Sequence, residues 1–405
     1  MWRNERRAAI INPMRLLHRI YLSPGFFGFG KLGAFDYFEH VESELVHQLR
    51  AAGDEARTHV LNVLPTASIR RRACKLGELI AETAGPEGPI HIIGHSTGGL
   101  DARVIVSPDA DVGLPPELLA WLPRVASVTT LNAPHYGTPM ASFFSTVQGQ
   151  RWLYVLSALT YVALVVGAPP LSIASTLLVA MRQLQGVLGL DVRLLDRVAE
   201  SLLRVVDDAR SDEIRNFIES ILNDQGAVIQ LMPESMDLFR AGINDRPGVR
   251  YQCVATMAPP PNPKGFFRSL KNPWETLSTA IFAAQYSITS RYDERYPCAA
   301  RDVDDEAEAV FQRSVSRVPG ARANDGVVPT LSQVWGHLVW AGYADHLDVL
   351  GHFRGRNAEM SAKGRHNDWL ISGSEFNEEK FKTMMSRVAD GIVASSERWR
   401  GDRAP

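Results

Sequence analysis

The sequence predicts an α/β fold in which a mostly parallel sheet is covered by helices on both faces. Short apolar runs typical of buried strands alternate with segments whose apolar residues recur at helical spacing. Strands separated by helices favour parallel pairing. Hydrophobic residues make up 45% of the 405 residues and charged residues 22%, which is ordinary for a chain that buries a large core.

The alternation is clearest in the first third of the chain, where Phe38, Val41 and Leu45 fall on one helical face. Helices are predicted over 38–49 and 67–84. Strands are predicted over 20–22, 59–64, 90–93, 128–131 and, after a long break, 249–254. A proline-rich loop over 258–263 ends the last of these strands.

Charge and cysteine content exclude several classes of protein. With 43 basic and 45 acidic residues the net charge is −2, so no overall basic field attracts nucleic acid. Cys74, Cys253 and Cys298 are far apart, which excludes a disulfide scaffold or a cysteine-rich zinc site and favours a reducing compartment. The first 25 residues lack an apolar core followed by a small-residue cleavage site, so we expect no signal peptide and a cytoplasmic location.

The strongest motif is Gly94-His95-Ser96-Thr97-Gly98, which matches G-x-S-x-G. It follows the predicted strand 90–93 and precedes a helix-capable stretch, as the nucleophile turn of an α/β-hydrolase does. Small residues at 94 and 98 suit a turn that crowds the backbone around Ser96, and a helix N-terminus there favours negative charge. The alternative is a glycine-rich turn of another doubly wound fold, with Ser96 capping the helix.

A serine nucleophile needs a base, and the base needs an acid that orients it. In α/β-hydrolases the acid follows the serine in the chain and the histidine comes last. Asp325 lies in a polar turn, and His346 follows 21 residues later. The alternatives are Asp345 and Asp348 for the acid and His337 and His352 for the base, whereas His91 and His95 do not fit the order.

These stretches resemble the bacterial true lipases typified by the Pseudomonas and Burkholderia triacylglycerol lipases. The resemblance covers about 20–140 and 228–355 and implies an α/β-hydrolase fold, with Ser96 as nucleophile, Asp325 as acid and His346 as base. It also implies an oxyanion hole formed by the backbone N–H groups of Phe26 and Thr97. The similar stretches are Tyr21–Phe29, Asp36-Tyr37-Phe38, Gly94–Gly99, Asn132–Thr138, Leu231–Phe239, Asn324-Asp325-Gly326 and His346-Leu347-Asp348.

The chain departs from this family at three places. Pro24 stands where the family has a histidine that braces the oxyanion loop, and Leu331-Ser332 stands where secreted members have a cysteine, which favours an intracellular variant. The family's structural calcium would be held by Asp305 and Asp348, with His352 at the position of an amide ligand. Histidine is a poor calcium ligand, and the alternative is that 302–305 is a solvated acidic turn.

A helical insertion is predicted over 141–228, inside an α/β-hydrolase core formed by 1–140 and 229–405. Residues 152–181 carry no charge and are interrupted by Gly167-Ala168-Pro169-Pro170. This stretch has three possible structures: an apolar lid over the site, two core helices, or a membrane-inserted hairpin. Residues 152–168 are short for a bilayer span, and we favour the lid because the insertion lies between the serine motif and the acid loop.

The resemblance implies carboxylic ester hydrolysis through an acyl-enzyme, with no cofactor needed for the chemistry. A triacylglycerol is the favoured substrate because the insertion is so apolar, and the cap would contact a lipid droplet or membrane surface. One alternative is an intracellular polyester (polyhydroxyalkanoate) depolymerase. Another is a non-catalytic hydrolase-fold module that binds lipid, against which the presence of Ser, Asp and His in the required order argues.

Overall fold

A six-stranded parallel sheet forms the centre of the computed structural model. The order is β4-β1-β5-β6-β7-β8, and every neighbouring pair runs parallel. The strands are β1 (Leu17–Ser23), β4 (Glu55–Val60), β5 (Ile90–His95), β6 (Val125–Leu131), β7 (Arg250–Met257) and β8 (His337–Tyr343). A separate antiparallel pair is formed by β2 (Lys31–Leu32) and β3 (Phe35–Asp36). The structure describes residues 15–26, 31–32, 35–64, 66–165, 177, 197, 200–201, 224–262, 273–300, 302–352 and 370–401.

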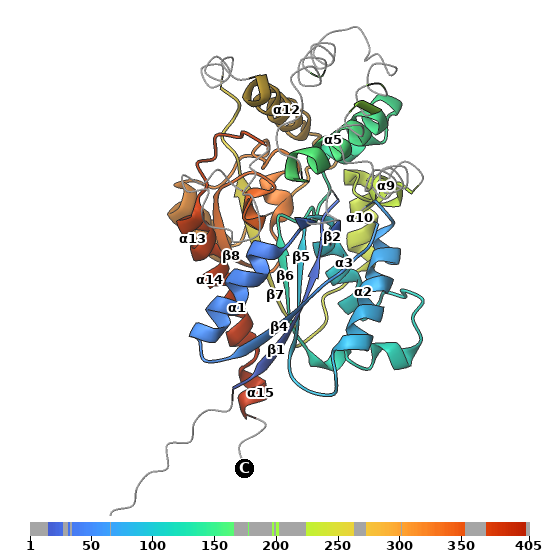
Figure 1. Cartoon of the computed structure of the whole chain (residues 1–405), viewed down its shortest axis with the longest axis vertical. Coiled ribbons are helices and arrows are strands. Elements are labelled where there is room, and N and C mark those ends of the chain that lie inside the picture. The colour runs from blue at the N-terminus through green and yellow to red at the C-terminus, as the bar shows by residue number, and fades with distance from the viewer. Residues whose placement is uncertain are drawn as a thin grey trace, which may run out of the picture.

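Helices cover both faces of this sheet (Figure 1). On one side α1 packs with α14, and on the other α2 packs with α3. The helices are α1 (Glu39–Ala51), α2 (Ile69–Thr83), α3 (Thr97–Val106), α4 (Pro139–Phe144), α5 (Val147–Val165), α9 (Gly226–Gln230), α10 (Pro233–Gly242), α12 (Pro273–Thr289), α13 (Asp305–Val315), α14 (Glu378–Ser395) and α15 (Glu397–Gly401). The predicted α/β architecture with a parallel sheet is therefore confirmed.

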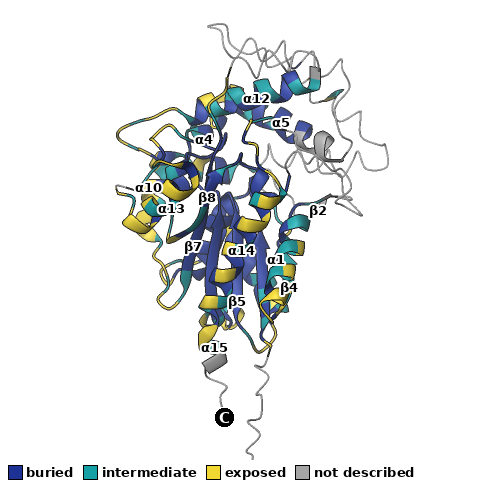
Figure 2. Cartoon of the chain, turned by 90° about the vertical axis from the view of Figure 1, so that its left-hand side faces the viewer, coloured by how far each residue is buried: buried dark blue, intermediate teal, exposed yellow. Residues whose placement is uncertain are grey.

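The buried faces of the helices follow from the spacing of their apolar residues. In α2, Ile69, Leu76 and Ile80 recur at helical spacing and are buried. Ser68 caps this helix, because its hydroxyl accepts a hydrogen bond from the backbone N–H of Arg71. In α3 every residue is buried, as expected of a helix that lies across the middle of the sheet. Figure 2 shows the inner strands of the sheet as buried, with exposed residues on the outer faces of the helices.

One predicted strand is displaced in the structure. The apolar run 59–64 was expected to pair, but β4 covers Glu55–Val60 instead. As an edge strand, β4 pairs only with β1 and is half-buried, so it has little of the apolar alternation that marks a strand. Leu61 follows the strand and turns into the core, where its backbone N–H bonds to the Leu22 carbonyl at 2.8 Å. The other predicted strands and both predicted helices are confirmed.

The described part of the predicted insertion lies beyond the carboxyl ends of the strands, where α5 is seen above the sheet (Figure 1). Every residue from 152 to 159 except Tyr154 is buried, and Trp152 is among the largest fully buried side chains. Most of 166–223, where the predicted helical insertion was expected to continue, lies outside the described residues. None of the helices in the described part of the chain combines the length and apolarity that a bilayer-spanning segment needs.

A pair of substitutions in α5 tests whether this helix is part of the core. Leu156→Asp should lower the free energy of unfolding by roughly 3 kcal/mol, because it buries a carboxylate without a partner. Val147→Asp on the same helix is the matched control. Its side chain is 70% exposed, so the change should stay within about 0.5 kcal/mol. Urea unfolding measures both, and equal stability of the two variants would instead favour a helix that uncovers its apolar face.

Candidate active site

The turn between β5 and α3 presents Ser96 at the carboxyl edge of the sheet. Ser96 has φ 53° and ψ −126°, a conformation that costs an L-residue strain. A Cβ atom at Gly94 would overlap the backbone of Gly98 and Gly99, and one at Gly98 would overlap the carbonyl of Ser23. Only glycine fits at 94 and 98. As the first residue of α3, Thr97 has a backbone N–H without an acceptor inside the helix.

The segment Ser23–Phe26 lies against this turn and is fixed by buried charges. Arg72 forms an ion pair with Asp101 at 2.7 Å and also donates to the carbonyl of Pro24. The Ser23 hydroxyl donates to the same Asp101 carboxylate at 2.7 Å. Burial raises the pKa of Asp101, and the Arg72 guanidinium opposes this shift. Arg72 thus holds the backbone at Pro24, the position at which the resembling family has a histidine.

Phe26 carries one of the two predicted oxyanion donors, and the residue before it is packed on the nucleophile. A Cβ atom added at Gly25 would lie 2.7 Å from the Cβ of Ser96, so this loop and the serine turn are in contact. Phe26 is buried, and its ring stacks on that of Phe144. The loop that carries Phe26 and the helix start that carries Thr97 therefore both adjoin Ser96.

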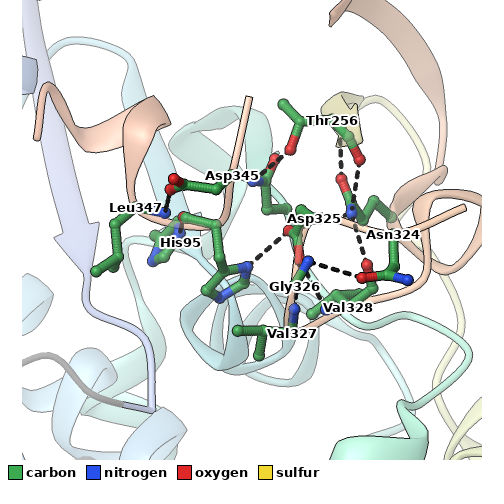
Figure 3. A network of polar contacts seen from close by, with 12 residues as sticks. His95, Thr256, Asn324, Asp325, Gly326, Val327, Val328, Asp345 and Leu347 are labelled. Carbon is green, nitrogen blue, oxygen red and sulfur yellow. Dashed lines mark hydrogen bonds and ion pairs between the residues drawn. The ribbon is translucent and has the colours of Figure 1, made fainter. Parts of the chain in front are cut away.

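Asp325 is buried in the turn that follows Asn324, and four donors surround its carboxylate (Figure 3). One oxygen accepts the backbone N–H groups of Val327 and Val328 at 2.9 and 2.7 Å. The other accepts from His346 Nδ1 at 2.7 Å and from Gln333 Nε2 at 3.2 Å. Both oxygens are saturated, so the carboxylate has a fixed orientation toward the histidine.

His346 lies in the loop after β8 and is anchored through its backbone as well as its ring. Its backbone N–H donates to the Asp325 carbonyl at 3.0 Å. Because Nδ1 is used by Asp325, Nε2 is the nitrogen left for a reacting group. Ser96 and His346 do not hydrogen-bond to each other in this structure; such contacts are commonly long without substrate and shorten in the substrate complex.

Tyr37 and His95 connect the loop at Gly25, after β1, to the loop at His346, after β8. The Tyr37 hydroxyl accepts from the Gly25 backbone N–H at 3.3 Å and lies 2.7 Å from His95 Nδ1. His95 Nε2 lies 2.9 Å from the backbone carbonyl of His346. Both side chains are buried, and the His95 and His346 rings are 4.7 Å apart.

Asp345 and Asp348, the alternative acids, hold the turn around His346 rather than its ring. Asp345 accepts the backbone N–H groups of Leu347 and Asp348 at 3.0 and 3.1 Å (Figure 3). Asp348 accepts the backbone N–H of Asp345 and the Ser374 hydroxyl. Burial raises the pKa of Asp345 to about 6, against hydrogen bonds that lower it.

The other histidines considered from the sequence lie elsewhere. His337 is exposed at the start of β8 and pairs with Glu306 at 3.3 Å. His91 is buried in β5, where it bonds to His18 and Ser127. His352 is buried beside His40, with ring centroids 5.7 Å apart. None of these three is hydrogen-bonded to Asp325 within the described chain.

The residues expected to bind calcium do not fit such a site. Asp305 is exposed in the first turn of α13, whose Glu306 pairs with His337 at the start of β8. Asp348 follows the other end of β8, and the seven residues of that strand span roughly 20 Å. The Asp348 carboxylate also already accepts two hydrogen bonds. Asp304 caps α13, as an acidic turn at a helix start does. Among the described residues no group of three or more His, Cys, Asp or Glu side chains could hold a metal ion.

An apolar pocket opens beside Ser96, and its empty space, including the part open to solvent, is about 350 Å³. Among the described residues, Thr138 is the only polar wall residue besides Ser96, and its hydroxyl donates to the carbonyl of Val327. The remaining lining residues are Phe26, Pro134, Met140, Ala141, Phe144, Val228, Leu231, Val327 and Val328. The pocket can therefore accept an apolar group bound next to the serine.

Sequence reasoning missed the residues that support the site. Arg72 falls on the apolar face of α2, between Ile69 and Leu76, and a charge at a core-facing position usually has a buried partner. That signal was present in the sequence, although it does not identify Asp101 as the partner. Tyr37 belonged to a resembling stretch without having a role, and His95 was set aside because it precedes the serine.

Comparisons with known proteins gave structural likenesses alone. No family model and no curated protein matches the chain. It is similar to EstA from Clostridium botulinum, with 17% identity and a TM-score of 0.48 over 92% of this chain and 88% of that one. It is also similar to Staphylococcus hyicus lipase, with 17% identity and a TM-score of 0.47 over 96% of this chain and 98% of that one. Lipase 1 from Pelosinus fermentans is similar with 17% identity and a TM-score of 0.47 over 92% of this chain and 98% of that one. None of the three comes from Pseudomonas or Burkholderia, and the residue roles rest on the geometry of this chain.

The buried carboxyl of Asp345 predicts a pH-dependent stability that Asp345→Asn removes. The folded chain holds this proton up to pH about 6, whereas the unfolded chain releases it near 3.8. Stability should therefore fall as pH rises through this interval, by up to about 1.4 kcal/mol per pH unit. Asparagine keeps an oxygen for the two backbone N–H groups and does not titrate. The free energy of unfolding, measured with urea at several pH values between 3.8 and 6, should fall more steeply with rising pH in wild type than in the variant. Equal pH dependence of the two proteins would contradict the prediction.

Proposed function

We propose that the chain is a serine hydrolase of carboxylic esters, with Ser96 as nucleophile, His346 as base and Asp325 as the acid that orients the base. The observation that supports this most is the short His346–Asp325 hydrogen bond at the sheet edge where the strained turn presents Ser96. A merely structural serine would not need a backbone conformation of this cost. The apolar pocket beside the serine supports an acyl group as the part of the substrate that binds there.

The proposed reaction proceeds through an acyl-enzyme. His346 Nε2 takes the proton of the Ser96 hydroxyl as its oxygen attacks the ester carbonyl, and Asp325 stabilises the imidazolium that forms. The backbone N–H groups of Thr97 and Phe26 would bind the oxyanion, and the N-terminus of α3 favours the same negative charge. His346 then returns the proton to the leaving alcohol, and water releases the acid by the same steps in reverse order.

The favoured substrate is a long-chain acyl ester such as a triacylglycerol. The described walls of the pocket offer an alkyl chain apolar contact, and the hydroxyl of Thr138, a polar wall residue, is already hydrogen-bonded to the Val327 carbonyl. Contact with a lipid surface through the apolar insertion belongs to the same proposal. Triolein and amorphous polyhydroxybutyrate, assayed side by side, separate a lipase from a polyester depolymerase.

Replacing the nucleophile tests the proposed chemistry. Ser96→Ala should reduce kcat on a chromogenic ester by about 10³-fold or more while the protein remains folded. A fluorophosphonate should label wild type at Ser96 and leave the variant unlabelled, as mass spectrometry of the peptides would show. Ser145→Ala, an exposed serine at the end of α4, is the matched control and should keep full activity. Undiminished turnover by folded Ser96→Ala would rule out this nucleophile.

The size of the pocket predicts acyl-chain preference. Ala141→Leu adds bulk to a small, buried wall residue and should lower kcat/KM for decanoate esters relative to butyrate esters by about 10-fold, since the longer chain loses space. The ratio of the two kcat/KM values cancels any loss of active protein. An unchanged ratio would mean that the acyl chain does not enter this pocket.

A further inference from the structure

A chain of hydrogen bonds with a fixed direction runs from the Gly25 backbone to the His346 carbonyl through the buried side chains of Tyr37 and His95. The His346 carbonyl can only accept, so His95 Nε2 must carry a proton. Burial lowers the pKa of His95 well below its usual range, so the ring is neutral and its Nδ1 must accept. The donor to Nδ1 is then the Tyr37 hydroxyl, whose oxygen in turn accepts the Gly25 N–H.

Each end of this chain is part of the machinery of the proposed reaction. Gly25 precedes Phe26, the proposed oxyanion donor, and is in contact with Ser96. His346 is the proposed base, and its carbonyl is the atom that His95 holds. His95 itself directly precedes Ser96 at the end of β5. One chain of three hydrogen bonds therefore joins the oxyanion loop, the nucleophile strand and the base.

We propose that Tyr37 and His95 are positioning residues that set the distance between the oxyanion donor and the base, a role that rests on the proposed ester hydrolysis. Neither side chain touches the reacting atoms in this assignment. They act by fixing the backbone at Gly25 and at His346, so that donor and base are placed together before substrate binds. Displacement of a catalytic group by about 1 Å can cost on the order of 10²-fold in rate, so a backbone anchor of this kind has a measurable effect.

The loop at Gly25 has little room to move away from the Tyr37 hydroxyl and His95. A Cβ atom at Gly25 would lie 3.0 Å from both the Tyr37 hydroxyl and His95 Nδ1, so the loop is packed directly on these two atoms. Tyr37 also packs edge-on against Phe38 at 4.9 Å, which holds the ring when the hydroxyl is removed. Tyr37→Phe therefore deletes one hydroxyl from the middle of the chain and keeps the packing of the ring.

The first experiment compares Tyr37→Phe with Tyr21→Phe. Tyr21 is also buried, and Phe at this position removes its hydroxyl's hydrogen bond to Thr83, whereas Tyr37→Phe removes two hydrogen bonds, to Gly25 and His95. Tyr21 lies within β1, away from the residues proposed to act in catalysis. We expect Tyr37→Phe to lower kcat by about 10-fold with KM within twofold, and to weaken binding of an alkylboronic acid, which mimics the tetrahedral intermediate, by a similar factor. Tyr21→Phe should lower Tm without either effect.

The second experiment asks whether the two residues act as one unit. Gln at 95 can place an amide N–H toward the His346 carbonyl, whereas Leu cannot, so His95→Gln should retain more activity than His95→Leu. The double variant Tyr37→Phe/His95→Leu should be no slower than His95→Leu alone, because breaking one chain twice has no second cost. If the two side chains only packed independently, the activity losses of Tyr37→Phe and His95→Leu would multiply in the double variant, and His95→Gln would be no more active than His95→Leu.

The outcomes separate this inference from the proposed function. An active wild type whose Tyr37→Phe variant has the same kcat and the same boronic acid affinity contradicts the positioning role alone. The positioning role is also contradicted if the fold-loss in kcat of the double variant equals the product of the two single losses. A wild type that neither hydrolyses esters nor reacts with a fluorophosphonate contradicts the proposed function, and the positioning role falls with it.

Discussion

The turn that joins β5 to α3 has no room for a side chain at Gly94 or Gly98, and the positions of the other groups in the site depend on this crowding. The carbonyl of Ser23 lies where a Cβ of residue 98 would be, so the end of β1 is pressed against the start of α3. The loop that follows β1 must then lie beside Ser96. The chain fixes this close approach with the buried ion pair of Arg72 and Asp101: Arg72 donates to the Pro24 carbonyl, and Asp101 accepts from the Ser23 hydroxyl.

The parallel sheet was predictable because apolar runs of strand length alternate with helical periodicity, and both signals are local. The signal failed at β4, where a half-buried edge strand carries Glu55 and Arg57 and an apolar run follows it. It was also silent on β8, α12, α13 and α14. Their packing joins separate elements, as α14 packs with α1 and α12 with α4, and such contacts cannot be read from a single window of sequence.

The residues proposed as nucleophile, acid and base could be suggested from the sequence because the G-x-S-x-G motif, followed by an acid and then a histidine, is typical of α/β-hydrolases. The resemblance pointed to Asp325, whereas the residues alone left Asp345 and Asp348 open as alternatives, since all three occupy polar turns near a histidine. The distinction is which oxygens face the imidazole and which face backbone N–H groups. Tyr37 and His95 could not be assigned for a related reason: their importance lies in contacts between segments up to 251 residues apart.

The left-handed backbone of Ser96 has a consequence for how such a chain would change if its activity were no longer needed. The conformation at φ 53° and ψ −126° costs about 1–3 kcal/mol for serine and much less for glycine. If Ser96 is the nucleophile proposed above, glycine at this position would make the protein more stable and catalytically inert at once. On that proposal, stability and catalysis make opposite demands on this one residue.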